Sequence, residues 1–139
     1  MIKNVLRGIF VLGSVSLLVA CGSSGNDSGA SNGSICDPVA FAMIHTARGD
    51  AKVCAATIQC VSSQCADTAK KCAGPDYASG TYAGTCGSYF DCVKTCKCEK
   101  TCVDKCDVGT LDCSSCLSID LALGCNLKCI TEIASCGKQ

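Results

Sequence analysis

The chain has 139 residues, with 12 basic and 12 acidic side chains, 17 cysteines and no tryptophan. Without Lys3 and Arg7, which lie in an N-terminal segment that we expect to be removed, the balance is 10 to 12 and the net charge is −2. Since a basic patch is the minimum footprint of a nucleic-acid surface, this balance argues against a nucleic-acid partner. After Cys36 the chain contains only eighteen Val, Ile, Leu and Phe residues, so a large apolar core is excluded and the fold needs cross-links.

The first twenty residues have the pattern of a targeting segment. Lys3 and Arg7 are followed by an apolar run of twelve residues, IFVLGSVSLLVA, at 9–20. Such a run rises about 18 Å as a helix, which is too short for a hydrocarbon core of about 30 Å. We therefore predict that residues 1–20 are a signal peptide. The two basic residues are not adjacent, so there is no twin-arginine signal and we expect the chain to be exported unfolded.

The apolar run ends in LVAC at residues 18–21. This sequence resembles the bacterial lipobox, in which aliphatic and small residues precede the cysteine that is lipidated and becomes the new N-terminus. The resemblance implies that Cys21 carries the lipid and that the chain contacts a membrane through it; an ordinary cleaved signal with a chance thiol is the alternative. Gly22 stands where an Asp marks inner-membrane retention in enteric lipoproteins, which points to the outer membrane or the cell surface in a Gram-negative cell.

A polar segment follows the lipobox. Residues 22–34, GSSGNDSGASNGS, offer no large apolar side chain to bury, and a Gly/Ser-rich chain of this length has a root-mean-square reach of about 20 Å. We therefore divide the chain into a signal peptide (1–20), a lipidated cysteine with a flexible tether (21–35) and a cysteine-rich domain (36–139).

Helix signals divide the domain into four segments. Asp37 and Pro38 are typical of an N-cap and a first helical residue, and Gly49 of a C-terminal stop. A Gly-rich loop at 74–84 and a break at 108–110 separate the later segments. The resulting prediction is helices near 38–47, 51–72, 87–106 and 111–135.

The cysteine spacing contains a repeat. The interval from Cys54 to Cys60 recurs 32 residues later from Cys86 to Cys92, a period typical of stacked helical units. The strict alternation of strands is missing. We predict an all-α fold, a small disulfide-stapled bundle of three to four helices built from degenerate repeats of about 32 residues.

The domain holds sixteen cysteines, an even number, in a compartment that permits oxidation, so we predict eight disulfides whose pairing the spacing does not fix. They are Cys36, Cys54, Cys60, Cys65, Cys72, Cys86, Cys92, Cys96, Cys98, Cys102, Cys106, Cys113, Cys116, Cys125, Cys129 and Cys136.

Five of these cysteines lie in the stretch DCVKTCKCEKTCVDKC, residues 91–106. On a continuous helix they share an arc of about 160°, although Glu99 falls in the same arc, so that it lies at the edge or the chain bends near 97–99. Cysteines four residues apart on a helix have Cβ atoms about 5–6 Å apart, farther than a disulfide allows, so C-x3-C is expected to bond to a neighbouring helix. We expect most of the five to be bridged to cysteines in 54–72 or 113–136.

Two other chemistries are alternatives to structural disulfides. Soft thiolates select Cu(I), and the sequence is similar in style to bacterial copper-storage proteins, helical bundles whose C-x3-C helices line a core with thiolates. CSSC at 113–116 has the C-x-x-C form, but the strand that a thioredoxin-like site needs is missing. His45, the single histidine, is expected at the surface of the first helix rather than as a ligand. We predict no metal, no cofactor and no catalytic residue.

Taken whole, the chain resembles the cysteine-rich lipoproteins of myxobacteria, with their lipobox, Gly/Ser tether and helices rich in C-x5-C and C-x3-C. The resemblance implies a disulfide-rich surface lipoprotein without an assigned activity. We expect a non-enzymatic protein anchored to the cell envelope, with a structural or interaction role, whose partners are the membrane and another envelope protein.

Overall fold

The computed structural model describes residues 35–49 and 52–136, and helices are the only regular secondary structure in these ranges. The predicted all-α, disulfide-rich fold is confirmed. The predicted signal peptide, Cys21 and residues 22–34 of the predicted tether lie outside the described residues. The elements are α1 (Pro38–Arg48), α2 (Ala55–Gln64), α3 (Ala66–Ala73), the 3-10 turn η1 (Tyr77–Ser79), α4 (Gly87–Thr95), α5 (Lys100–Val103), α6 (Leu111–Ser115), the π-helix η2 (Cys116–Cys125), α7 (Asn126–Lys128) and α8 (Ile130–Cys136).

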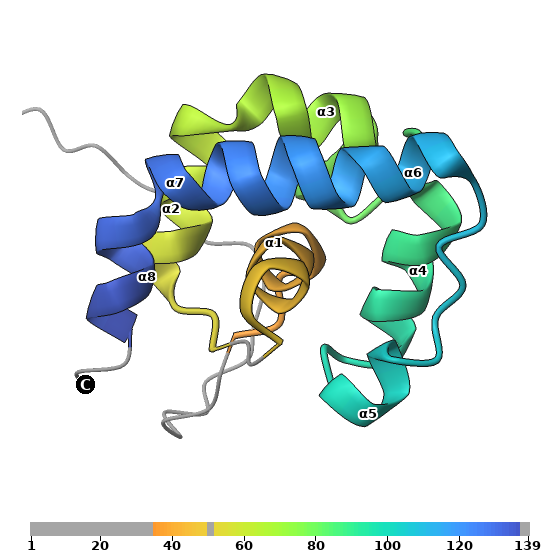
Figure 1. Ribbon diagram of the computed structural model, residues 1–139, viewed down its shortest axis with the longest axis horizontal. Coiled ribbons are helices and arrows are strands. Elements are labelled where there is room, and N and C mark those ends of the chain that lie inside the picture. Colours follow the sequence, from red (N-terminus) through yellow and green to blue (C-terminus); the bar gives the residue numbers. More distant parts are fainter. Residues whose placement is uncertain (1–34, 50–51, 137–139) are drawn as a thin grey trace, which may run out of the picture. The chain divides into compact units, whose positions relative to one another are not determined.

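Helix α1 is the centre of the core. Its N-cap, Asp37, accepts a hydrogen bond from the backbone N–H of Ala40 at 2.8 Å, and Gly49 ends it with a φ of 72°, as predicted. The seven residues from Pro38 to Ile44 are all buried. A helix that is buried all round must be covered on several sides, and α1 contacts α2, α4, η2 and α7. Figure 1 shows α1 almost end-on, with these elements arranged about it.

The rest of the chain forms one long hairpin that is curled around α1. One arm of this helical hairpin carries α2, α3 and α4, and the other arm carries α5 to α8. Helix α2 packs against α8, and α3 packs against η2. In Figure 1 the run from α6 to α7 lies alongside α3. Seven disulfides join the two arms, and each lies inside the loop that the previous one closes. From the open end of the hairpin to its turn, they are Cys54–Cys136, Cys60–Cys129, Cys65–Cys125, Cys72–Cys116, Cys86–Cys113, Cys92–Cys106 and Cys96–Cys102.

The eighth bridge, Cys36–Cys98, has a different role. It runs from the residue before the α1 cap to the turn of the hairpin, and it crosses all seven nested bridges in the sequence. The Cα atoms of bridged cysteines are 4.9 to 5.9 Å apart in all eight pairs, which is the separation that a disulfide requires. Cys36–Cys98 is therefore the bridge that fastens the central helix to the hairpin.

Three of the four predicted helices are divided in the structure. The helix predicted over 51–72 begins at Ala55 and is interrupted at Cys65, where φ is −125°. The helix predicted over 111–135 contains the ten-residue π-helix and turns by 77° between Lys128 and Ile130. A straight helix of the same length would diverge from α1, so these bends keep the hairpin in contact with the surface of α1.

Candidate functional site

All sixteen cysteines from Cys36 to Cys136 are paired, as predicted. Four of the bridges are fully inside the core, with each cysteine at most 5% exposed, and they take the place of large apolar side chains: Cys60–Cys129, Cys65–Cys125, Cys72–Cys116 and Cys86–Cys113. The other four lie at the two ends of the hairpin, and each contains at least one partly exposed cysteine. The framework therefore has a buried middle and accessible ends.

The turn of the hairpin corrects the expectation for residues 91–106. We expected most of its five cysteines to reach 54–72 or 113–136, and this is wrong. Cys92–Cys106 and Cys96–Cys102 close within the stretch, and Cys98 bonds to Cys36. The C-x3-C pair at 92 and 96 does form two rungs, but to the short segment that follows it.

The cause is a break in the helix. Helix α4 ends at Thr95, and after the C-cap Cys96 the residues Lys97 and Cys98 have positive φ values of 51° and 56°. Glu99 then caps α5, since its carboxylate accepts hydrogen bonds from the backbone N–H of Thr101 at 3.1 Å and of Cys102 at 2.8 Å. The bend that Glu99 suggested is present, and it brings Cys102 opposite Cys96.

The sulfur clusters offer no thiolate in this state. The sulfurs of Cys92, Cys96 and Cys106 lie within 4.8 Å of one another, and Cys96 Sγ is 4.0 Å from Cys106 Sγ. All three belong to disulfides, and the thiolate is the form that binds metal. The copper alternative therefore needs reduction of the framework.

The CSSC sequence does not form a C-x-x-C disulfide. Cys113 in α6 bonds to Cys86, and Cys116 at the start of η2 bonds to Cys72. The two cysteines therefore join their helices to different places on the opposite arm of the hairpin. Both are buried. A redox site needs an accessible sulfur, so the geometry of this pair favours a structural role.

His45 is not the surface residue that we expected. Its side chain is only 13% exposed, packs against the ring of Phe41 at 5.3 Å, and places Nε2 2.9 Å from a carboxylate oxygen of Asp104. Burial lowers the pKa of His45, an effect that outweighs the opposing influence of Asp104 and adds to that of Lys100. Nδ1 is buried and has no hydrogen-bond partner among the described residues, so a neutral ring that donates from Nε2 to Asp104 fits best.

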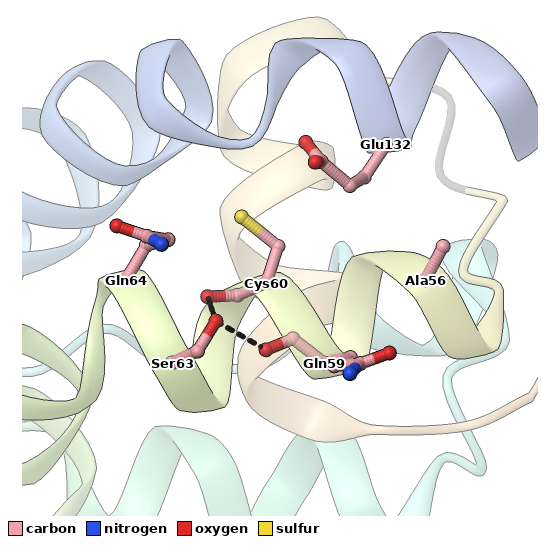
Figure 2. Close-up of a pocket in the computed structure, with 6 residues that line it drawn as sticks. All are labelled: Ala56, Gln59, Cys60, Ser63, Gln64 and Glu132. Atoms are coloured by element: carbon pink, nitrogen blue, oxygen red, sulfur yellow. Dashed lines mark hydrogen bonds between the residues drawn. The ribbon is translucent and has the colours of Figure 1, made fainter.

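A small surface pocket lies between α2 and α8 (Figure 2). It is lined by Ala56, Gln59, Cys60, Ser63, Gln64 and Glu132 and has a volume of about 240 Å³, below the range typical of ligand sites. The hydroxyl of Ser63 donates to the backbone carbonyl of Gln59, and the sulfur of Cys60 is bonded to Cys129. The one carboxylate in the pocket lining is that of Glu132. The lining therefore does not combine an acid, a base and a free nucleophile.

The sequence reasoning missed an exposed apolar surface, which we call the apolar stripe. It consists of Ile119, Leu123, Leu127 and Ile130, which are between 47% and 68% exposed. The first three are spaced by four residues along η2 and α7, so they lie near one face of the helix run. Buried Leu121 and Cys125 belong to the same run, which contacts α1. The four-residue spacing of these aliphatic residues indicates a shared helix face. Whether that face is buried or exposed depends on which side of the helix contacts α1, and the sequence does not show this.

The apolar stripe belongs to a region that is apolar but not a simple membrane span. Among the described residues no single helix is long and apolar enough to cross a membrane. The segments Leu111–Lys128 and Ile130–Cys136 meet the length and hydropathy requirements only as a pair, with the 77° bend between them.

No family model, no curated protein and no solved structure matches the chain significantly.

Proposed function

We propose that the chain is a lipid-anchored protein of the cell envelope, whose disulfide-rich domain has a structural or interaction role without catalysis. The observation that carries the proposal is the pairing of all sixteen domain cysteines in eight bridges. Disulfides at this density persist in oxidising compartments outside the cytosol. The sequence LVAC at 18–21 supports an anchor at Cys21.

The framework supports a role that depends on durability. With few large apolar side chains, the domain gains its stability from bridges that constrain the unfolded chain, typically by about 2–4 kcal/mol each. Four of them are buried, out of reach of external thiols. A domain of this kind keeps its shape where proteins meet proteases and changing solutes.

The apolar stripe supports the interaction role. Single exposed aliphatic residues are ordinary, but Ile119, Leu123 and Leu127 form an exposed helix face along η2 and α7. Ile130 adds a fourth exposed side chain just beyond the bend, at the start of α8. Helix faces of this type pack against an apolar groove of another protein. We infer that the second partner is an envelope protein that presents such a groove.

The anchor is tested by metabolic labelling with an alkyne fatty acid. The wild-type chain should take up the label and partition with membranes, whereas Cys21→Ser should do neither, because the modified atom is that sulfur. Cys36→Ser is the matched control, since it lies after the tether and should keep the label. Label on the Cys21→Ser chain, or none on the wild type, contradicts the anchor.

The interaction role is tested by photo-crosslinking in intact cells. A photoreactive residue at Leu123 should give one adduct of defined mass, and Leu127→Glu should abolish it by placing a charge in the contact. The same photoreactive residue at exposed Lys105, on the hairpin turn, is the control. If Leu123 and Lys105 give the same adducts, or Leu123 gives none, the stripe is not an interaction surface.

A further inference from the structure

The order of the bridge partners along the chain divides the domain cysteines into two groups. Every bridge joins one of the first eight domain cysteines to one of the last eight, and no bridge closes within residues 36–96. The first eight are Cys36, Cys54, Cys60, Cys65, Cys72, Cys86, Cys92 and Cys96; the last eight begin with Cys98. The nesting of seven bridges and the crossing of the eighth both produce this division.

The division matters during export, when the N-terminus emerges first. Eight thiols reach the oxidising space before any native partner does. The wait for a partner ranges from 6 residues for Cys96 to 82 residues for Cys54. If the chain emerges at the rate of its synthesis, about 5–20 residues per second, the longest wait is about 4–16 s, which is within the time in which disulfides form.

Wrong partners are nearby throughout this wait. Cys54 and Cys60 are six residues apart, and Cys60 and Cys65 five. The probability of closing a flexible loop falls with about the 3/2 power of its length, so an unfolded chain closes Cys54–Cys60 about 50 times more often than Cys54–Cys136. The emerging half of the domain will therefore collect short non-native bridges.

We propose that the domain reaches its native pairing through disulfide isomerisation, and that its assembly partner is an envelope thiol–disulfide isomerase with a reactive dithiol. The inference rests on the proposed export. A protein disulfide oxidant accepts the sixteen hydrogens of the sixteen thiols and leaves eight bridges, of which several are non-native. The isomerase then changes their partners without net oxidation.

The exchange step balances in sulfur and charge. A thiolate of the isomerase attacks one sulfur of a non-native bridge, forms a mixed disulfide and releases the other cysteine of the domain as a thiolate. That thiolate attacks a second bridge, and the chain of exchanges ends when a domain thiolate attacks the mixed disulfide and the isomerase thiolate leaves. No electron is gained or lost by the domain.

The burial of the framework gives this exchange a direction. Cys65, Cys72, Cys116 and Cys125 are at most 2% exposed once the hairpin has closed around α1. A bridge inside the core is inaccessible to an external thiolate, whereas a non-native bridge in an unfolded segment is open to attack. Isomerisation therefore proceeds until the four buried native bridges have formed, after which these bridges are no longer attacked.

The test is export of the full chain in two bacterial strains that share a disulfide oxidase but differ in a periplasmic disulfide isomerase. Bridges are mapped by mass spectrometry after the free thiols are blocked. With the isomerase, the eight native bridges should dominate. Without it, non-native bridges within 36–96 should appear, and native pairing should fall most for Cys54–Cys136 and least for Cys96–Cys102.

Equal native pairing in the two strains overturns the proposal, and so does a loss that is unrelated to the separation of the partners. The same mapping on a chain with a cleavable signal and Cys21→Ser separates this result from the anchor. That chain has no lipid site, so its dependence on the isomerase should persist even if the lipid assignment fails. A catalytically dead isomerase, with its two cysteines replaced by alanine, should behave as the missing enzyme does.

Discussion

Removal of the bridge that fastens α1 should cost more stability than removal of the shortest bridge. The perturbation is the double substitution Cys36→Ala/Cys98→Ala, and the control is Cys96→Ala/Cys102→Ala, which opens a neighbouring bridge in the same turn. Cys36 is exposed and Cys98 is half-buried, so the first change leaves no buried cavity. Alanine adds no hydroxyl that would need a partner.

The expected magnitude follows from the loops that the two bridges close. The partners are 62 residues apart in Cys36–Cys98 and 6 residues apart in Cys96–Cys102. In the chain-entropy description, loops of these lengths correspond to about 4 and about 2 kcal/mol of stabilisation at 25 °C. The nested bridges run across the hairpin, so they hardly shorten the covalent path along the chain from Cys36 to Cys98. The expected difference of about 2 kcal/mol between the two variants therefore remains.

The assay is equilibrium unfolding in guanidinium chloride under non-oxidising, non-reducing conditions, with helicity as the signal. Hydrogen exchange adds a local measurement, because α1 should lose protection in the first variant and keep it in the control. A loss of unfolding free energy that is equal in both variants, or larger in the control, refutes the assignment of Cys36–Cys98 as the fastening of the central helix.

Three further predictions use other features. Intact mass of the exported domain should show the loss of sixteen hydrogens and no uptake of Cu(I); many free thiols that bind Cu(I) would instead favour the copper alternative. Phe90→Ala should cost about 3–5 kcal/mol in unfolding free energy, because Phe90 is fully buried; a loss below 1 kcal/mol would contradict that burial. Because burial lowers the pKa of His45 in the folded chain, the unfolded chain binds this proton more readily near pH 6.5 and just below it. Stability should therefore fall as the pH drops through that window, and an equal slope in His45→Gln would exclude His45 as the cause.

Local chemistry made part of the fold predictable. Asp37 and Gly49 bound α1 as expected, because a cap needs only the few residues around it. The 32-residue repeat also has a structural meaning, since Cys54 and Cys86 are the N-caps of α2 and α4. Each of these helices begins at one cysteine and carries the next one six residues later.

The pairing and the site could not be predicted in the same way. Lys97 and Cys98 adopt a left-handed conformation without a glycine to indicate it. Glu99 indicates a bend near 97–99, but the sequence does not show that this bend brings Cys102 to Cys96. The position of His45 depends on Asp104, which is distant in sequence and is placed by the closed turn. Lipidation of Cys21 and the location of the protein stay predictions.

The nested bridges also limit how far the domain extends when it is pulled. An unbridged chain from Cys36 to Cys136 would stretch to about 350 Å at about 3.5 Å per residue. In the bridged domain the shortest covalent route between these ends follows the chain only from Cys36 to Cys54 and then crosses to Cys136, where the Cα atoms are 5.8 Å apart. Tension applied between Cys36 and Cys136 can therefore separate them by only about 70 Å, about a fifth of the unbridged length.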